Sequence, residues 1–274
     1  MLRIQESILS QGAVLIGYLH EASEEIPNRD VRPAIIFCPG GAYTMLSKRE
    51  EDSPAFAFFS RGYHVFILRY SIGDKAANLN PLMEASAAVM RLRENAENWG
   101  IIPNQIAIAG FSAGGHLAAS LGVHWNAPDL KAVLDTKNGA NRPDALILCY
   151  AVLTGGEYAH STSFERVSGI IENKNAEDQK SELHFWSLNK HVNSSTPPAF
   201  LWHTMDDDVV PVENSIFMTQ ALHDAGVHCE CHLFAHGAHG LSTCNHESNS
   251  VNQPCAQWVP LCAAWLSDLF LFRE

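Results

Sequence analysis

Short apolar runs and amphipathic stretches take turns along almost the whole chain. Near the N-terminus, Arg3–Leu9 and Ala13–His20 alternate between apolar and polar positions and are joined at Gln11–Gly12. This alternation predicts an antiparallel pair of strands. Further along, continuous apolar runs predict strands that are buried on both faces. These runs are Pro33–Cys38, His64–Tyr70, Gln105–Gly110, Asp144–Ala151, Pro198–Thr204 and His228–Phe234.

Stretches with helical spacing separate these runs. Pro81–Trp99 begins with a proline, which suits a first helical turn, and places Ala85, Ala88 and Leu92 on one face. Strands that alternate with helices predict a mostly parallel central sheet with helices on both faces. We therefore expect residues 1–274 to form a single α/β domain. The other expected helices are Gly114–Trp125, Pro211–Ala225 and Cys255–Phe270.

One long segment breaks this alternation. Thr154–Pro197 lies between two predicted core strands and is rich in Ser, Asn, Glu and His. It is too long for an ordinary connection. It is either a small helical insertion that forms a cap over a site or a mobile loop.

Composition narrows the classes of partner. The chain has 18 Lys+Arg against 30 Asp+Glu, a formal net charge of −12, and no basic run. This balance argues against nucleic acid and anionic membrane surfaces as main partners. No apolar run approaches the roughly 18 residues that a membrane-spanning helix needs. The alternating N-terminus is interpreted as part of the fold rather than as a secretion signal.

The cysteines point to a reducing compartment. The chain has seven of them, an odd number, and most lie inside apolar runs. Buried free thiols are typical of proteins from a reducing cytosol, so we expect a cytoplasmic location. The residues are Cys38, Cys149, Cys229, Cys231, Cys244, Cys255 and Cys262.

Neither a metal nor a nucleotide cofactor is expected. The best metal-binding candidate is His228–His232, but alternate residues of a strand point to opposite faces and separate these ligands. The chain also has no glycine-rich phosphate-binding motif after a strand.

The sharpest chemical signal is G-x-S-x-G at Gly110–Gly114, between a predicted strand and a predicted helix. Such a turn requires small flanking residues, because strand and helix approach closely around a strained serine. The turn places the Ser112 hydroxyl at a helix N-terminus, where the dipole favours a developing anion. Ser112 is therefore the candidate nucleophile; the alternative is a tight turn in which Ser112 only caps the helix.

A serine nucleophile needs a base and an acid that orients the base. The order Ser…Asp…His is typical of this elbow. Asp206, Asp207 and Asp208 follow one later strand, and His236 and His239 follow the last strand. The positions alone leave the choice among these residues open.

Four segments together resemble the esterase and lipase branch of the α/β-hydrolases, closest to the acetyl-xylan-esterase-like and hormone-sensitive-lipase-like carboxylesterases. They are Cys38–Tyr43, Gly110–Ala119, Pro197–Pro211 and His236–Leu241. The resemblance implies an α/β-hydrolase fold. It also implies a triad of Ser112, Asp207 and His239, because Asp207 precedes Val210–Pro211 and His239 lies in the G-x-H-G turn. His236 is the reserve.

The resemblance also implies an oxyanion hole. Its donors are the backbone N–H of Ala113 and that of Gly41, with Gly40 beside it. The hormone-sensitive-lipase pattern is H-G-G-G, whereas this chain has Pro39 in place of the His and Ala42 in place of the third Gly. This departure favours the acetyl-xylan-esterase-like group.

Several further residues stand out beside these motifs. Tyr43 is expected to wall the acyl pocket, and Trp186 either stacks on a sugar or aromatic group or belongs to the core of the cap. His116 is expected to pack under the site. The apolar Trp265, Leu269 and Phe270 suit a homodimer interface as well as a core.

The sequence thus predicts a serine carboxylesterase that hydrolyses short-chain acyl esters, acetyl groups on sugars among them, through an acyl-enzyme and without a cofactor. Three alternatives stay open. An aryl formamidase would use the same triad, and a prolyl-oligopeptidase-like peptidase shares the elbow but normally carries a large extra domain. A catalytically inactive hydrolase fold would bind ligands or partners only.

Overall fold

The computed structural model describes residues 1–9, 12–169 and 176–272, and its centre is an eight-stranded sheet with the order β1-β2-β4-β3-β5-β6-β7-β8. Each strand predicted from an apolar or alternating run is present, with ends shifted by a few residues. The bounds are β1 Leu2–Ile8, β2 Ala13–Leu19, β3 Arg32–Cys38, β4 His64–Arg69, β5 Ile101–Phe111, β6 Ala145–Cys149, β7 Ala199–Thr204 and β8 Cys229–Phe234.

The sheet is antiparallel at one side and parallel elsewhere. β1 pairs with β2 and β2 with β4 in antiparallel register, for example Ile4 opposite Gly17. From β4 through β3, β5, β6 and β7 to β8 all pairings are parallel. The predicted N-terminal pair is confirmed, although Gln11 of its expected turn lies outside the described residues.

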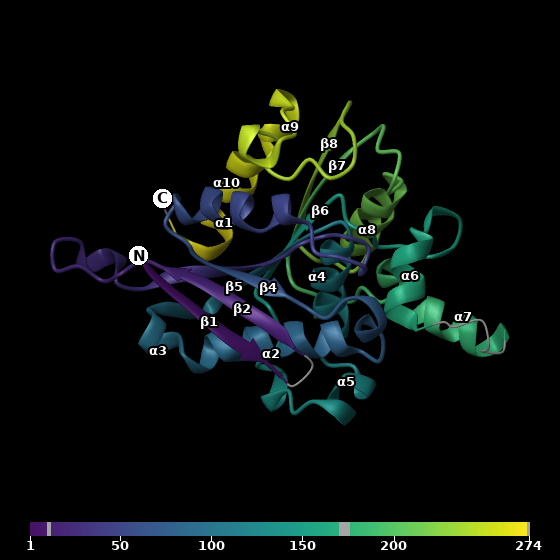
Figure 1. The fold of residues 1–274 in the computed structure, drawn as a ribbon, viewed down its shortest axis with the longest axis horizontal. Helices are drawn as coiled ribbons and strands as arrows, with labels where there is room; N and C mark the ends of the chain where they lie inside the picture. The colour runs from purple at the N-terminus through teal and green to yellow at the C-terminus, as the bar shows by residue number, and fades with distance from the viewer. Residues whose placement is uncertain (10–11, 170–175, 273–274) are drawn as a thin grey trace.

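Helices cover both faces, as predicted, and Figure 1 shows α1 and α10 above the sheet and α2 below it. The alternation along β3 explains the two layers: Ile36 packs into the core under α2 and α4, whereas Ile35 and Phe37 pack into the core under α1 and α10. The helices are α1 Asp52–Phe59, α2 Asn80–Glu94, α3 Ala96–Trp99, α4 Ala113–His124, α5 Pro128–Val133, α6 Ser161–Ser168, α7 Ala176–Phe185, α8 Glu213–Asp224, α9 Gln253–Ala256 and α10 Trp258–Phe270.

Helix boundaries differ from the predictions in two ways. The single helix expected over Pro81–Trp99 is divided into α2 and α3 at Asn95, whose backbone angles (φ −103, ψ 15) are not helical. The helix expected over Cys255–Phe270 is likewise divided into α9 and α10. Helices α1 and α5 were not predicted; α1 reads DSPAFAFF, which has too few polar positions to show helical periodicity.

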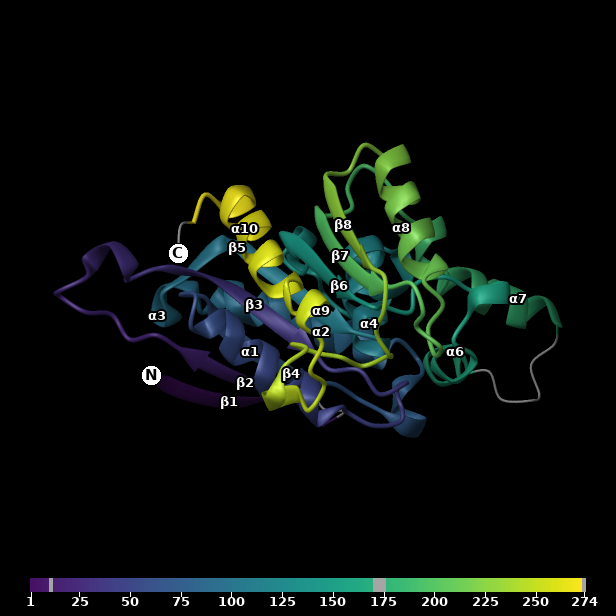
Figure 2. The same cartoon turned by 90° about the horizontal axis from the view of Figure 1, so that it is seen from above.

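The segment expected as a cap or a loop contains α6 and α7, with residues 170–175 outside the described part. Figure 2 places both helices at the end of the molecule beside α8. The segment returns to the body where the Leu188 N–H donates to the Leu153 carbonyl at 2.9 Å. The described part of this segment is thus partly helical.

The apolar side chains of the last helix pack into the core. Trp265 and Phe270 are buried against the sheet, and Leu269 packs against the same cluster. All seven cysteines are free thiols, and Cys229 and Cys231 are the two that are not fully buried. Among the described helices, none combines the length and the apolarity that crossing a bilayer demands.

Candidate active site

Ser112 occupies a sharp turn between β5 and α4 at the carboxyl edge of the sheet. Its backbone lies at φ 53, ψ −119. A positive φ of this kind is energetically unfavourable for any residue other than glycine. Close packing holds the turn: a Cβ atom on Gly114 would lie 2.0 Å from the Cys38 carbonyl oxygen, and one on Gly110 2.0 Å from the Gly114 carbonyl oxygen. These two positions therefore need glycine for steric reasons, as the motif predicts.

Three side chains far apart in the sequence form a hydrogen-bonded chain at this edge. His239 Nε2 lies 2.9 Å from Ser112 Oγ, and His239 Nδ1 lies 2.7 Å from Asp207 Oδ2. His239 follows β8 and Asp207 follows β7, which is where the sequence places candidates for both roles. The imidazole is thus oriented by a carboxylate on one side and faces a hydroxyl on the other, the geometry that general-base activation of a serine requires.

The Asp207 carboxylate is buried but well satisfied. Its Oδ1 accepts hydrogen bonds from the N–H groups of Val209 and Val210, both at 2.9 Å. Burial by itself would raise the pKa of Asp207, but hydrogen bonds from His203 and His239 outweigh it and hold the pKa well below its usual range. Asp207 is therefore ionised at neutral pH.

The neighbouring candidates are engaged elsewhere. Asp206 Oδ2 pairs with His236 Nδ1 at 3.0 Å, and both side chains are largely exposed. The Gly237 N–H also donates to Asp206 Oδ1, at 2.7 Å. The structure brings Asp207 and His239, rather than this second pair, to Ser112.

The loop after β3 supplies a backbone turn beside the serine. Gly41, Ala42 and Tyr43 all have positive φ, and the N–H groups of Thr44 and Met45 donate to the Gly41 carbonyl. In the described part of the chain, no acceptor is bonded to the N–H of Gly41 or of Ala113.

Gly40 requires a correction. Its N–H donates to Glu50 Oε2 at 2.8 Å, so this amide is not available to a substrate oxygen. A Cβ atom here would lie 2.7 Å from that same oxygen and 3.0 Å from Ser112 Cβ. The residue is thus glycine because it is packed between Glu50 and Ser112, whereas Gly41 remains a candidate donor.

A pocket of about 390 Å³ opens beside Ser112 and His239. His160, which precedes α6, reaches it from the insertion. Exposed Met45 and Val209 give the rim an apolar part. The lining residues are Gly41, Ala42, Thr44, Met45, Ser47, Arg49, Glu50, Ser112, His160, Val209, His239 and Gly240.

Tyr43 and Trp186 do not line this pocket, which corrects the expectation of substrate contacts. Both are buried in the core. His116 joins them: its Nδ1 accepts from the Tyr43 hydroxyl at 2.9 Å, and its Nε2 lies 3.1 Å from the Trp186 carbonyl oxygen. Tyr43 is turned inward by this bond. His116 packs under the site, as expected.

Four residues around the site were missed by the sequence analysis: Glu50, Tyr150, His160 and His203. His203 Nε2 lies 3.2 Å from Asp207 Oδ2 and 2.9 Å from the Val210 carbonyl oxygen. A histidine inside the apolar strand run Pro198–Thr204, shortly before the acid, was a usable signal for it. Glu50 lies in the charged run Lys48–Asp52, which resembles a solvated loop, so the sequence offered no signal there.

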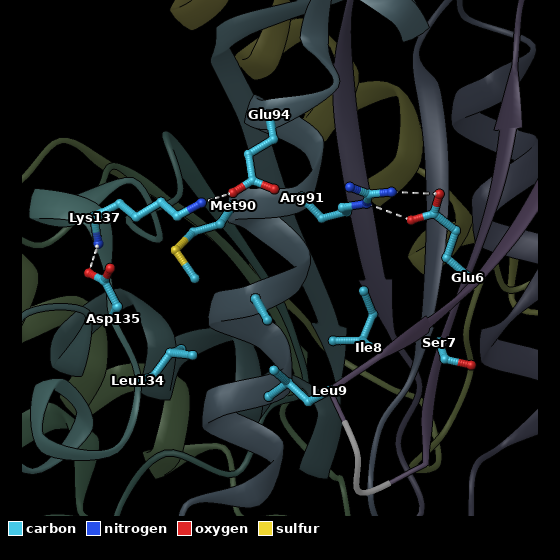
Figure 3. Close-up of a pocket in the computed structure, with 11 residues that line it drawn as sticks. Glu6, Ser7, Ile8, Leu9, Met90, Arg91, Glu94, Leu134, Asp135 and Lys137 are labelled. Atoms are coloured by element: carbon cyan, nitrogen blue, oxygen red, sulfur yellow. Dashed lines mark hydrogen bonds and ion pairs between the residues drawn. The ribbon is translucent and has the colours of Figure 1, made fainter.

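Another hollow, of about 500 Å³, lies away from the serine between β1 and α2 (Figure 3). Its charged side chains pair with one another: Arg91 Nε lies 2.6 Å from Glu6 Oε2, and Lys137 pairs with Glu94. None of the described residues that line it is a histidine, so Ser7 has no base there of the kind that a nucleophile needs. Among the described residues, no group of His, Cys, Asp and Glu has an arrangement that suits a metal ion.

Comparison with known proteins gives one family match. The sequence model of the family described as BD-FAE matches residues 24–222. Among curated proteins, endo-1,4-beta-xylanase B of Butyrivibrio fibrisolvens is 36% identical over 85% of this chain and 35% of its own length. An acetylxylan esterase of Xylanibacter ruminicola is 30% identical over 79% of this chain and 42% of its own length. The chain therefore spans less than half the length of these two relatives.

Solved structures agree over nearly the full chain. An acetyl ester-xyloside bifunctional hydrolase from Caldicellulosiruptor lactoaceticus superposes with a TM-score of 0.81 at 34% identity, covering 96% of this chain and 90% of that one. The carboxylesterase Cest-2923 of Lactobacillus plantarum gives a TM-score of 0.84 at 25% identity, with both chains fully covered. These matches confirm the α/β-hydrolase fold.

Proposed function

Because the chain belongs to the BD-FAE family of α/β-hydrolase carboxylesterases, we propose that it hydrolyses short-chain acyl esters, acetyl esters of carbohydrates foremost, with Ser112 as nucleophile. The observation that most supports this proposal is the hydrogen-bonded chain of 2.9 and 2.7 Å from Ser112 through His239 to Asp207. The carbohydrate part rests on the names of two relatives, an acetylxylan esterase and an acetyl ester-xyloside hydrolase.

The first half of the reaction forms an acyl-enzyme. Ser112 Oγ attacks the ester carbonyl carbon while His239 Nε2 takes the hydroxyl proton, and Asp207 stabilises the imidazolium that results. The carbonyl oxygen gains negative charge and accepts hydrogen bonds from the N–H groups of Gly41 and Ala113. When the intermediate collapses, the bond to the alkoxy oxygen breaks and His239 gives its proton to the leaving alcohol.

The second half returns the enzyme. Water takes the place of the alcohol, loses a proton to His239 and attacks the acyl carbon, so that the acid leaves and Ser112 recovers its hydrogen. Both halves need a neutral imidazole at the start. Hydrolysis should therefore slow once acid protonates this imidazole.

The insertion has a part in this proposal. We propose that residues 154–197 act as a small cap, since His160 at the start of α6 lines the pocket. A cap of this size offers no large apolar lid for a long acyl chain, which favours short-chain esters over long-chain ones. The mostly buried thiols support a cytoplasmic location.

One substrate panel tests the function against its alternatives. Wild type and Ser112→Ala would be compared on p-nitrophenyl acetate, butyrate and palmitate, on acetylated xylo-oligosaccharides, on N-formylkynurenine and on a proline-linked amide. We expect acetate and acetylated sugar to be hydrolysed fastest and Ser112→Ala to be inactive. Preferred cleavage of the formamide or of the amide would replace the esterase proposal, and no turnover of any substrate, together with no fluorophosphonate labelling of Ser112, would favour a binding protein.

A further inference from the structure

Glu50 is a buried carboxylate beside the nucleophile that receives hydrogen bonds from two sides. Its side chain lies in η2, the short helical turn Lys48–Glu50, and the residue is 2% exposed. Oε2 accepts from the Gly40 N–H at 2.8 Å, and Oε1 accepts from the Tyr150 hydroxyl at 2.7 Å. Burying a charged group is costly unless it is satisfied in this way. This buried, fully hydrogen-bonded position indicates that Glu50 has a specific role at the site.

The same network reaches the loop that carries the base. The Tyr150 hydroxyl accepts from the Ser242 N–H at 2.8 Å, and Ser242 follows His239 by three residues. The Tyr150 ring also meets the His239 ring edge-on, with centroids 5.0 Å apart. The Ser242 hydroxyl in turn donates to the Arg49 carbonyl at 2.6 Å. Glu50 thus joins the loop after β3, the end of β6 and the loop after β8.

The bonding pattern requires both carboxylate oxygens to act as acceptors. A backbone N–H such as that of Gly40 can only donate. The Tyr150 oxygen already accepts from Ser242, so its own proton points to Glu50. Burial raises the pKa of Glu50, and the hydrogen bonds from Tyr150 and Gly40 and the charge that forms on His239 offset only part of this rise. The ionised form fits these partners without any rearrangement.

We propose that Glu50 is a positioning residue for the hydrolytic reaction: it fixes Gly40 so that the next amide, Gly41, faces the developing oxyanion, and it provides a fixed negative charge near the imidazolium. This inference rests on the proposed esterase function and extends it. Glu50 acts through Gly40 and His239 and need not touch the substrate. Positioning of this kind matters most in the transition state, because the oxyanion and the imidazolium exist only there.

Few other groups near this network titrate between pH 4 and 9. Tyr70, Tyr150 and Cys149 interact electrostatically with Glu50, but burial raises the pKa of each well above its usual value, so they stay neutral. His160 and Asp207 face His239, and burial lowers the pKa of His160. A change at Glu50 that alters the pH profile therefore acts through the carboxylate and the imidazole.

The principal test is Glu50→Gln, which keeps the shape but not the charge. Its amide must present the N–H₂ either to the Gly40 N–H, which can only donate, or to the Tyr150 hydroxyl, which would then have to turn its own proton away. Either way, one of the two hydrogen bonds of Glu50 is lost. We expect kcat for p-nitrophenyl acetate to fall about 10- to 100-fold, less than the loss of a whole oxyanion donor, with KM nearly unchanged. The acid limb of the kcat profile should move to lower pH by about half a unit, since the carboxylate no longer favours the protonated imidazole.

Glu84→Gln is the matched control. Glu84 is also fully buried and accepts from the Ser71 N–H at 2.7 Å, but it lies on α2 away from His239. We expect this substitution to lower the free energy of unfolding while kcat and the pH profile remain those of wild type. If Glu84→Gln and Glu50→Gln lose kcat equally, the effect is that of a buried amide and the proposal is overturned.

Tyr150→Phe separates the two parts of the proposal. It removes the hydrogen bond to Glu50 and the acceptor of the Ser242 N–H, but it keeps the carboxylate charge and the ring against His239. We expect kcat to fall about 3- to 10-fold, less than in Glu50→Gln because the carboxylate charge remains, with no shift of the acid limb. Should Glu50→Gln fail to fold, Tyr150→Phe decides, and an unchanged kcat there overturns the proposal.

The measurements also distinguish the role of Glu50 from the proposed esterase function. Rates of fluorophosphonate labelling at Ser112 would be measured for every variant, since labelling also needs the base and the oxyanion hole but no natural substrate. Wild-type labelling rates, kcat and pH profile in Glu50→Gln, with an inactive Ser112→Ala, would overturn the role of Glu50 and leave the esterase standing. A wild type that labels but hydrolyses no ester would overturn the function, while slow labelling of Glu50→Gln would still support the positioning role.

Discussion

The loops at the carboxyl edge of the sheet and the insertion between β6 and β7 meet at one pocket but are held in different ways. At the edge, backbone packs on backbone, as at Gly114, where a Cβ atom would lie 2.0 Å from the Cys38 carbonyl oxygen. The insertion makes the backbone bond from Leu188 to Leu153, and it also rests on side chains: His116 bonds to the Trp186 carbonyl at 3.1 Å and His124 to the Phe185 carbonyl at 2.9 Å. The edge therefore suits chemistry, which needs fixed geometry, and the insertion suits selection among substrates.

The largest loss of activity is expected from a change at the edge that leaves the fold intact. Asp207→Asn should lower kcat by about 10⁴-fold, because the amide favours the wrong tautomer of His239 and cannot stabilise the imidazolium. Asp208→Asn is the control, since Asp208 is the neighbouring exposed carboxylate. It should retain kcat within about 2-fold, as surface changes usually do. Steady-state rates on p-nitrophenyl acetate check both, and a greater loss in Asp208→Asn would show that the acid has been misassigned.

A pair of glycine substitutions tests the difference in packing. Gly114→Ala drives a methyl group into the Cys38 and Pro39 carbonyls and should destabilise the protein by about 3 kcal/mol or more, or prevent folding. Gly155→Ala, at the start of the insertion, meets its nearest atom at 3.4 Å with φ −88, so its effect should stay within about 1 kcal/mol. Urea unfolding of both variants measures the difference. Equal losses would contradict the view that the edge is the more tightly packed region.

The sequence predicted the edge better than the insertion for physical reasons. Buried parallel strands need continuous apolar runs, and catalytic groups follow such strands directly. Position and motif therefore led to Ser112 and to the two loops with candidate acids and bases, while the choice of Asp207 and His239 came from the family resemblance. The surroundings of Glu50 depend on Tyr150, one hundred residues away in sequence, and no local pattern encodes that contact. Tyr43 was misplaced for a similar reason, because its partner His116 lies on another element.

As the pH falls, the insertion should lose local stability before the carboxyl edge of the sheet does. Burial lowers the pKa values of His116 and His124 to about 4, and both imidazoles contact insertion carbonyls. Their neutral forms stabilise the folded state above about pH 6.5, and this contribution is lost as the pH falls from 6.5 towards 4, because the unfolded chain binds protons first. Each is worth on the order of 3 kcal/mol.

Hydrogen exchange at pH 7 and pH 5 measures this effect region by region. Peptides covering α7 and the following turn should have lower protection factors at pH 5 than at pH 7. Peptides covering β5 and the start of α4 should have the same protection factors at both. Uniform loosening of both regions would mean that the histidines do not act on the insertion in particular.

The smallest effect is expected from His160→Ala, which alters the pocket from the insertion side only. The imidazole lines the pocket, its Nδ1 lies 2.9 Å from Ser163 Oγ, and it takes no part in the chain from Ser112 to Asp207. For p-nitrophenyl acetate, kcat should stay within about 2-fold of wild type. For acetylated xylo-oligosaccharides, KM should rise about 3- to 10-fold, the size of one hydrogen bond to a hydroxyl group. A large fall in kcat on both substrates would instead show that the insertion takes part in catalysis. The assignment of chemistry to the edge and of substrate selection to the insertion would then be wrong.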